Sequence, residues 1–249
     1  MNLDHPAFAP YRSLIDTLEL ARAIPALDAL NAQATTLGTH NAGDLPVRFF
    51  TPGGRLSARD YETRILQTGQ VPTRAGNWHD VLNALVWLRF PRFKAALNAA
   101  HGAAIATETD TQRGRRRDAL TVLDESGVWV ISRDPALPRL LANRAWHELF
   151  WDARPHVETD MHFVVVGHAL LEKALAPFAS MTGKCLMLHA NSLDPDAADA
   201  QAAAALGILD TPRQLAPLPV QGIPGWDAAN SDAAYYANPS VFRPAVQVA

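Results

Sequence analysis

Cysteine is almost missing from the sequence, which contains only Cys185 among 249 residues. One cysteine cannot form an intramolecular disulfide, and a CxxC pair with zinc-ligand spacing is excluded. Residues 1–6 also lack the basic segment followed by an apolar stretch that a secretory signal requires. We therefore predict a reducing compartment and a cytoplasmic location.

Long hydrophobic runs and an excess of positive charge are missing as well. The most apolar segment, 163–176, is interrupted by His168, Glu172 and Lys173, well short of the roughly 20 residues that span a bilayer. The formal net charge is −3 and the pI is near 6.3. We therefore expect no membrane span and no general nucleic-acid binding, because no global positive field attracts a polyanion. The ligand expected is a small polar or anionic molecule, and the oligomeric state is not indicated.

The composition is that of an ordinary globular protein, with 48% hydrophobic and 19% charged residues. No repeat, flexible linker or charge-block boundary divides the chain, so the sequence predicts one domain over 1–249. Its fold class is predicted as α+β, mostly helical around a central helix, with a small β-hairpin, a few short strands and an extended proline-rich arm. Three segments are expected: N-terminal helices and a short strand over 1–69, the body over 70–207, and the arm over 208–249.

The central helix is predicted over 77–90. Asn77 is a favourable N-cap, and Phe90 precedes Pro91, which disfavours helical geometry in the residue before it. The spacing of the apolar residues predicts one broad core face. That face contains Trp78, Val81, Leu82, Leu85, Val86 and Leu88. The opposite side carries His79, Asn83 and Trp87 with Asp80 close by, and Trp87 indicates that this side is also partly covered.

A β-hairpin is predicted from two strand-like runs, 120–123 and 128–131. Asp124-Glu125-Ser126-Gly127 between them has Asp first and Gly fourth, as a type I turn prefers.

The remaining helices and strands are predicted from the spacing of apolar residues and from residues that start or end an element. Helices are expected over 11–37 (two), 57–67, 92–100, 135–151, 167–176 and 195–206, strands over 47–50, 163–166 and 185–189, and a polar loop over 103–114.

The arm is predicted to pack on the body although six prolines forbid long regular elements. They stand at 212, 217, 219, 224, 239 and 244, interleaved with aromatic residues that include Trp226, Tyr235, Tyr236 and Phe242. A disordered tail would contain fewer aromatics.

The common catalytic motifs fail when they are checked residue by residue. His147-Glu148 would need a histidine at position 151 to form a zinc-binding HExxH helix, but Trp151 is there. Gly183-Lys184 is followed by Cys185, so the phosphate-binding loop motif is absent too. No GxSxG, GxGxxG or PCxxC signature occurs. The motifs thus specify neither a cofactor, which stays unknown, nor a metal.

The candidate catalytic residues are His79, Asp80 and His168, with Asn83, Arg117 and Asp118 as candidate substrate-binding residues. Histidine and carboxylate side chains can transfer protons, and an arginine can clamp an anion. We predict that His79, Asp80, Arg117, Asp118 and His168 converge on one partly accessible pocket, because polar groups on a buried helix need partners or water. The alternative is that these groups form a structural hydrogen-bonded network.

Several other polar groups have simpler interpretations. His168 and Glu172, four residues apart, could bind a metal or allow Glu172 to orient the imidazole, but two ligands do not make a site. Asp124 and Glu125 could form a paired-carboxylate site, but turn chemistry accounts for Asp124 and exposure accounts for Glu125. The basic cluster of Arg113, Arg115, Arg116 and Arg117 could clamp an anion or form a solvated loop. Cys185 is interpreted as a small buried hydrophobic residue.

The sequence resembles an uncharacterised bacterial family, the domain of unknown function 3025, over about 70–244. The matching stretches are Asn77-Trp78-His79-Asp80, Asn83-Ala84-Leu85-Val86-Trp87, Phe90-Pro91, Arg117-Asp118-Ala119-Leu120-Thr121, Asp124-Glu125-Ser126-Gly127, Gly167-His168-Ala169-Leu170-Leu171-Glu172, Gly222-Ile223-Pro224-Gly225-Trp226 and Val241-Phe242-Arg243-Pro244. The resemblance implies a soluble bacterial protein and carries no established reaction, cofactor or catalytic residue.

Two functions remain as hypotheses. The first is an enzyme of unassigned class, hydrolytic in type, that uses acid/base residues on a small polar or anionic substrate. The second is a noncatalytic binding or interaction protein with a structural histidine network. A deep polar pocket at His79 would favour the first hypothesis, and a flat exposed aromatic patch near the arm would favour the second.

Overall fold

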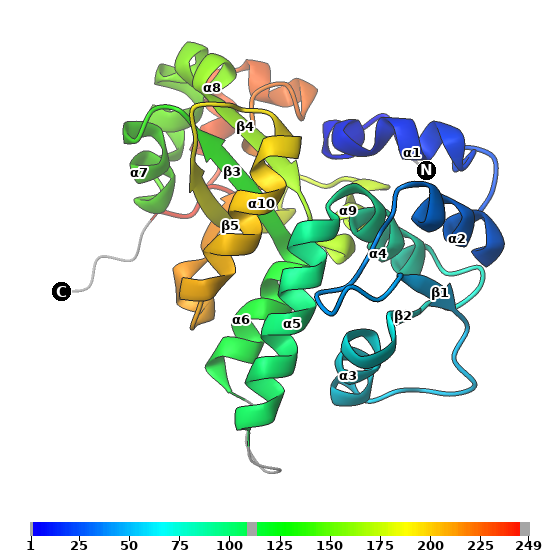
Figure 1. The fold of residues 1–249 in the computed structure, drawn as a ribbon. Coiled ribbons are helices and arrows are strands. Elements are labelled where there is room, and N and C mark those ends of the chain that lie inside the picture. Colours follow the sequence, from blue (N-terminus) through cyan, green and yellow to red (C-terminus); the bar gives the residue numbers. More distant parts are fainter. Residues whose placement is uncertain (1, 109–113, 245–249) are drawn as a thin grey trace.

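A mixed four-stranded sheet with helices around it dominates the computed structural model, which describes residues 2–108 and 114–244 (Figure 1). The strand order is β4-β3-β5-β6. Strand β3 (Gly127–Ser132) is antiparallel to β4 (Met161–Val165) and parallel to β5 (Thr182–His189), and β6 (Ala216–Pro219) is antiparallel to β5. Every residue of β3 is buried, as expected for a central strand of apolar β-branched and aromatic residues. The predicted α+β fold class is confirmed.

A second, two-stranded sheet and the remaining helices complete the fold. The sheet pairs β1 (Arg48–Phe50) in parallel with β2 (Gln70–Pro72). The helices are α1 (Arg12–Thr17), α2 (Leu27–Thr36), α3 (Ala58–Thr68), α4 (Trp78–Arg89), α5 (Pro91–Thr107), α6 (Arg115–Ser126), α7 (Ala136–Ala142), α8 (Arg154–Asp160), α9 (His168–Ala174) and α10 (Pro195–Ala205). Short helical turns are η1 (Pro6–Tyr11), η2 (Glu148–Asp152), η3 (Leu206–Ile208), η4 (Pro212–Gln214), η5 (Val220–Gly222), η6 (Ala228–Ser231) and η7 (Ala233–Ala237).

Helix α4 is the predicted central helix. Asn77 caps it by accepting a hydrogen bond from the Asp80 backbone N–H at 3.0 Å, and every residue from Val81 to Leu88 is buried. Leu82 and Leu85 on the core face are fully buried, while Trp78 is half-buried. Trp87 on the opposite face is buried as well. The prediction that both faces are covered is therefore confirmed, and the polar residues of α4 must find partners inside the protein.

The predicted hairpin is wrong. Residues 115–126 form α6, and 128–131 belong to β3, which pairs with β4 and β5 instead of folding back on 120–123. Arg117, Leu120 and Leu123 are buried on one side of α6, and this three-residue spacing is helical. The Asp-Glu-Ser-Gly sequence that resembles a turn is instead the end of a helix, where Gly127 starts the next strand.

The expected end of a helix near Gly102 is also wrong, because α5 continues to Thr107. A Cβ at Gly102 would lie 2.5 Å from a methyl carbon of Leu66 in α3. The glycine therefore permits α3 to approach α5 and does not end the helix. The predicted helix over 135–151 ends early as well, since α7 stops at Ala142 and Arg144 adopts a positive φ of 55°.

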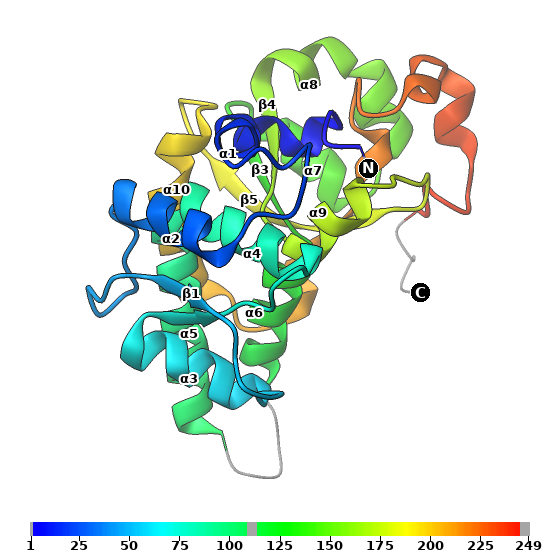
Figure 2. The same cartoon turned by 90° about the vertical axis from the view of Figure 1, so that its right-hand side faces the viewer.

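A close backbone crossing brings α6 and α9 together. The Gly127 carbonyl accepts hydrogen bonds from the backbone N–H groups of Val166, at 3.0 Å, and Gly167, at 2.9 Å. A Cβ on Gly167 would lie 2.3 Å from the Gly127 nitrogen, so only glycine fits there. Figures 1 and 2 show α4, α6 and α9 converging below the sheet, with α3 beyond them. The crossing thus places the last turn of α6 beside the first turn of α9.

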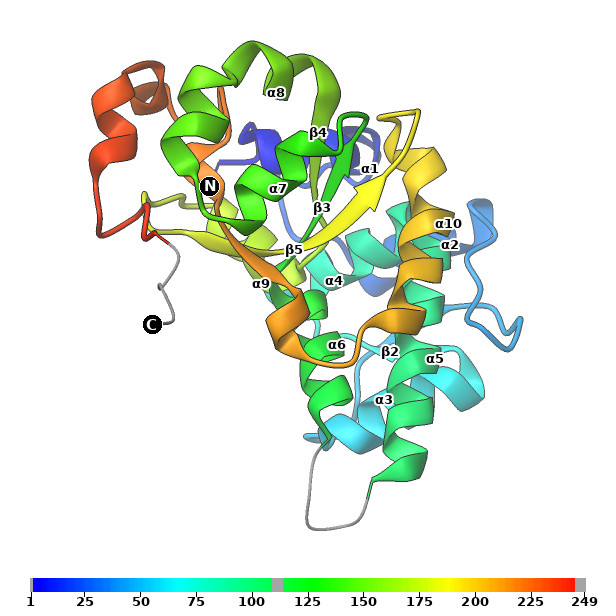
Figure 3. The same ribbon diagram turned by 90° about the vertical axis from the view of Figure 1, so that its left-hand side faces the viewer.

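The proline-rich arm packs on the body at the end that carries α7 and α8, on the opposite side from α3 (Figure 3). Tyr236 and Phe242 are buried with their rings 5.1 Å apart, and Trp226 is partly buried against the core. Trp146 donates a hydrogen bond to the Arg243 carbonyl at 2.9 Å. The last predicted arm residues, 245–249, lie outside the described residues. The segment boundaries at 69 and 207 stay predictions.

Among the described residues, no helix has the length and apolar content that a bilayer crossing demands. The buried hydrophobic residues of the sheet, α4, α5, α6 and α9 form one core, which the arm extends through Ile223, Tyr236 and Phe242. Cys185 is buried in β5, and burial raises the pKa of its thiol. This environment is that of the small buried hydrophobic residue predicted for it.

Candidate active site

A cavity of about 820 Å³ opens between α3, α4, α6 and α9. Its volume suits a small molecule. The polar and charged side chains that line it are Arg55, Ser57, Tyr61, Glu62, Arg74, His79, Asp80, Asn83, His101, Thr121, Asp124, Glu125 and His168. Four of the six predicted site residues, His79, Asp80, Asn83 and His168, are therefore in one place.

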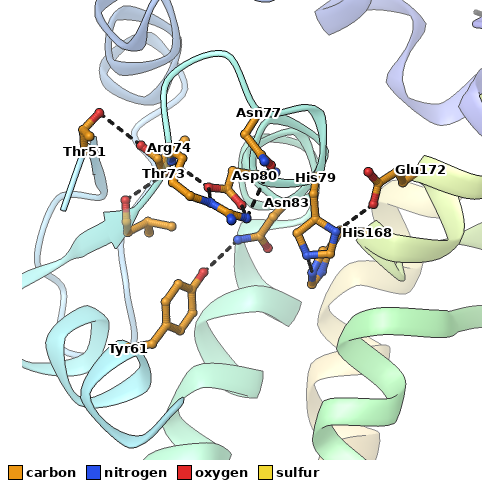
Figure 4. Close-up of polar contacts among 11 residues, drawn as sticks. Thr51, Tyr61, Thr73, Arg74, Asn77, His79, Asp80, Asn83, His168 and Glu172 are labelled. Carbon is orange, nitrogen blue, oxygen red and sulfur yellow. Dashed lines mark hydrogen bonds and ion pairs between the residues drawn. The ribbon is translucent and has the colours of Figure 1, made fainter. Parts of the chain in front are cut away.

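Two histidines from distant parts of the sequence meet in this cavity (Figure 4). The rings of His79 and His168 are 4.5 Å apart at their centroids and nearly perpendicular, with an interplanar angle of 81°. Their Nε2 atoms are 3.0 Å apart. The Nδ1 atom of His79 lies 2.9 Å from Oε2 of Glu172. Glu172 thus orients the imidazole of His79 instead of that of His168, its neighbour on α9.

His168 is the buried member of the pair. Burial lowers its pKa to about 4 and outweighs the opposing influence of the Asp124 carboxylate. Nδ1 of His168 lies 3.8 Å from an Asp124 carboxylate oxygen, and the Asp124 backbone beside the ring also favours the charged form. The imidazole is therefore neutral near pH 7, with one nitrogen facing His79 and the other facing a carboxylate.

A buried lysine holds Asp124 in place. Lys94 of α5 forms an ion pair with Asp124 and donates a hydrogen bond to Asn83 Oδ1 at 2.9 Å. Asn83 in turn donates to the Tyr61 hydroxyl at 2.9 Å. Burial opposes the charge on Asp124, but Lys94 and His168 outweigh it and lower the pKa of this carboxyl to about 2. A continuous polar network thus connects α3, α4, α5, α6 and α9 behind the cavity.

Glu62 has a carboxyl group that titrates near neutrality. Burial, followed by the negative charge of Asp124, raises the pKa of Glu62 to about 7. Opposing influences are a hydrogen bond from Asn98 at 2.7 Å and the positive charges of Lys94 and Arg117. Its other oxygen lies 4.0 Å from Nε2 of His101. A carboxyl that exchanges its proton near pH 7 is suited to general acid/base catalysis.

Asp80 has a different role from the one expected of a proton donor or acceptor. Its carboxylate accepts hydrogen bonds from the Arg74 backbone N–H and from two guanidinium nitrogens, at 2.6, 2.9 and 2.8 Å. Burial opposes ionisation, but these bonds outweigh it and lower the pKa of Asp80. Asp80 therefore stays charged and fixes Arg74 at the edge of the cavity (Figure 4).

Arg117 and Asp118 are not among the residues that line the cavity. The guanidinium of Arg117 is buried and forms an ion pair with Glu108 at 2.9 Å. Asp118 lies in the first turn of α6, where a negative charge is favourable. Arg113 of the basic cluster lies outside the described residues, and Arg116 pairs with Asp210 at 2.8 Å.

Sequence reasoning missed Glu62, Lys94, Asp124 and Glu125. Asp124 and Glu125 were assigned to a turn, but in α6 the residues Arg117, Leu120 and Asp124 follow each other at three and four residues and share one face. Interpreting 115–126 as a helix would have placed Asp124 on the buried face, beside Arg117 and Leu120. Lys94 and Glu62 had no comparable pattern, because their burial depends on the packing of α3 against α5.

One subset of these residues has the chemistry of a metal site. Ligand atoms of His79, Glu125 and His168 all lie within 4.8 Å of one another. Two imidazoles and a carboxylate are donors that divalent transition metals accept.

The fold and site define an α+β protein with a polar cavity that contains paired histidines. The chain belongs to the family described as protein of unknown function (DUF3025), whose model matches residues 47–246. No curated protein and no solved structure matches the chain.

Proposed function

We propose that this protein is an enzyme that hydrolyses a small polar or anionic substrate in the cavity between α3, α4, α6 and α9. The observation that carries the proposal is that paired imidazoles and a carboxyl with a pKa of about 7 line one cavity. Ionisable groups with strongly perturbed pKa values cluster at functional sites.

Each group has a role in this proposal. His79 and His168 form the reactive centre. An unprotonated imidazole nitrogen there accepts a hydrogen bond from water or from the substrate. Glu62 in its ionised form takes the proton from the attacking water and returns it to the leaving group. Arg74, which is exposed on the cavity wall and anchored by Asp80, binds a negatively charged part of the substrate.

Three predicted residues receive revised roles. Asn83 lines the cavity, but both of its polar ends bind protein groups, so we assign it to positioning Lys94 and Tyr61. Arg117 is engaged with Glu108, and Asp118 lies outside the cavity lining. We assign Arg117 an indirect role through its charge, which favours the ionised form of Glu62.

A flat exposed aromatic patch near the arm would favour the noncatalytic hypothesis. Tyr236 and Phe242 are buried instead, and Tyr235 packs against both with ring centroids 5.6 and 5.4 Å away. The aromatic residues of the arm thus pack in the interior and offer no flat exposed patch for a partner. The polar cavity therefore favours the catalytic hypothesis. The cytoplasmic location and bacterial origin predicted from the sequence accompany this proposal as predictions.

The proposal is tested with chromogenic carboxylic esters and phosphate esters as substrates for the purified full chain. We expect turnover of at least one class, with kcat/KM rising as pH increases through about 7 because Glu62 acts as a base. Glu62→Gln should lower kcat by about 10² to 10⁴-fold. Glu158→Gln, at an exposed ion pair with Arg154, is the matched control. Equal rates for Glu62→Gln and the parent protein would contradict the proposal.

A further inference from the structure

The paired histidines present an Nε2 atom to each other at a distance of 3.0 Å. Nδ1 of His79 faces the Glu172 carboxylate at 2.9 Å, and Nδ1 of His168 faces the Asp124 carboxylate at 3.8 Å. A carboxylate favours a protonated nitrogen opposite it. If both Nδ1 atoms carry the proton, the two Nε2 atoms bring their lone pairs within 3.0 Å of each other. Two lone pairs at that distance repel unless a proton or a metal cation lies between them.

A third ligand is available beside the pair. The Glu125 carboxylate lies with the two imidazoles in a group whose ligand atoms are all within 4.8 Å of one another. Glu125 is half-buried, and its side chain lines the cavity beside the two imidazoles. Its oxygens are therefore available to a cation. His168 is buried, and its Nε2 atom faces the cavity partner His79.

We propose that His79, His168 and Glu125 bind one divalent first-row transition metal ion, with Zn²⁺ as the reference ion. Two imidazoles and a carboxylate form the three-ligand set of open zinc sites, in which a fourth position is left for water or substrate. Ligand atoms about 2.1 Å from a tetrahedral ion lie roughly 3.4 Å apart. The Nε2 atoms, 3.0 Å apart, are close to this spacing, and a carboxylate oxygen of Glu125 lies within 4.8 Å of both imidazoles.

The surroundings of the three ligands fit a metal better than an acid/base pair alone. Glu172 and Asp124 occupy the outer positions from which carboxylates orient metal-binding imidazoles. Lys94 neutralises the charge of Asp124, so that this carboxylate stays behind His168 instead of competing for the ion. The ligands come from α4, α6 and α9, three rigid elements held together by the close crossing at Gly127 and Gly167.

The inference goes beyond the proposed function, because metal binding can be measured without any substrate. The full chain is treated with a chelator, dialysed and titrated with Zn²⁺ alone in a calorimeter, and visible absorption is recorded with Co²⁺. We expect one ion per chain. We also expect the intense visible bands of a four-coordinate Co²⁺ site.

The variants separate ligands from neighbours. His79→Gln and Glu125→Gln should weaken binding by more than 100-fold, and Glu172→Gln by about 10 to 100-fold, since it acts through His79. His147→Gln, a half-exposed histidine paired with Asp152, should bind as tightly as the parent. Glu62→Gln should bind Zn²⁺ normally even where hydrolysis is lost, which distinguishes failure of the metal site from failure of the proposed function.

Circular dichroism of each variant checks that the chain is folded. His79 and Glu125 are only partly buried, so their replacement should leave the fold intact. Absence of Zn²⁺ binding by the folded parent would overturn the inference. Undiminished affinity in both His79→Gln and Glu125→Gln would overturn it as well.

Discussion

Glu62 shows how the environment of one residue creates chemistry that its type does not. An exposed glutamate titrates near pH 4.3 and is a weak base at neutral pH. In this protein its carboxyl is almost enclosed, and Asp124 places a second negative charge nearby. Both influences favour the protonated form, and the hydrogen bond from Asn98 offsets them only in part. Glu62 therefore acts as a base near pH 7, and its ionised form lowers the free energy of unfolding of the protein.

The effect of Glu62 on stability can be measured directly. Its pKa in the folded state is about 7, above the unfolded value of about 4.5, so the folded state binds the proton more tightly. The stabilisation from this proton is present below pH 4.5 and is lost as pH rises through about 7. Glu62→Gln should therefore become more stable relative to the parent between pH 5 and pH 8, by on the order of 3 kcal/mol.

Urea unfolding of both proteins at pH 5, 6, 7 and 8 gives the difference. Shifts at Asp124 and His168 occur in both proteins and largely cancel. Glu158→Gln, whose carboxylate is exposed, should follow the pH profile of the parent. Parallel profiles for Glu62→Gln and the parent would mean that Glu62 is ionised throughout, and its role as a base near neutrality would be rejected.

At the level of elements, the site depends on how α6 and α9 are joined to the sheet. Both helices contact the sheet at the Gly127–Gly167 crossing: α6 ends just before β3, and α9 starts just after β4. Antiparallel pairing of β3 with β4 brings these two ends to the same edge. Asp124, Glu125 and His168 therefore meet because of strand pairing, not because of any sequence motif.

This crossing predicts a strong effect for a small substitution. Gly167→Ala would place a Cβ 2.3 Å from the Gly127 nitrogen, so the backbones must separate. We expect a loss of stability of about 1 to 3 kcal/mol or more from this overpacking. Gly207→Ala is the control, because a Cβ there meets no atom within 4 Å. Chemical denaturation measures both variants, and equal stability of the two would show that the backbones part without cost.

At the scale of the whole molecule, the arm extends the core at a distance from the cavity. Phe242 packs against Gly222, where a Cβ would come within 2.7 Å of its ring, and Tyr236 donates a hydrogen bond to the Gly222 carbonyl at 3.0 Å. Oε1 of Gln221 accepts a hydrogen bond from Nε2 of His5 at 2.8 Å, which ties the arm to the N-terminal segment.

Deletion of 221–249 should therefore destabilise the protein. Loss of a buried aromatic side chain costs about 3 to 5 kcal/mol, and each kcal/mol lowers the melting temperature of a chain of this size by about 2 to 4 °C. We expect a decrease of at least about 10 °C in a thermal scan. Phe242→Ala should lower the melting temperature, whereas Phe178→Ala, at a ring that is 48% exposed, should change it little. An unchanged melting curve after truncation would contradict the packing of the arm.

Local signals in the sequence determined the elements whose ends carry caps and whose faces are strongly periodic. Helix α4 between Asn77 and Pro91, helix α3 between Ser57 and Gly69, and the packed aromatic arm follow from such signals. Sequence-based predictions fail where the same residue type is common in two different local structures. Gly102 suggested a helix end and permits a helix contact, and the turn-like residues at 124–127 end α6.

Tertiary structure alone decided the candidate site. His79 and His168 are 89 residues apart in the chain and meet because α9 packs on α4. The pKa of Glu62 near 7 and the position of Lys94 behind Asp124 arise from burial, which no short sequence pattern specifies. The sequence by itself determined that α4 carries polar groups on a covered face. Which partners those groups find depends on long-range packing, because partner distance and solvent access are properties of the folded chain.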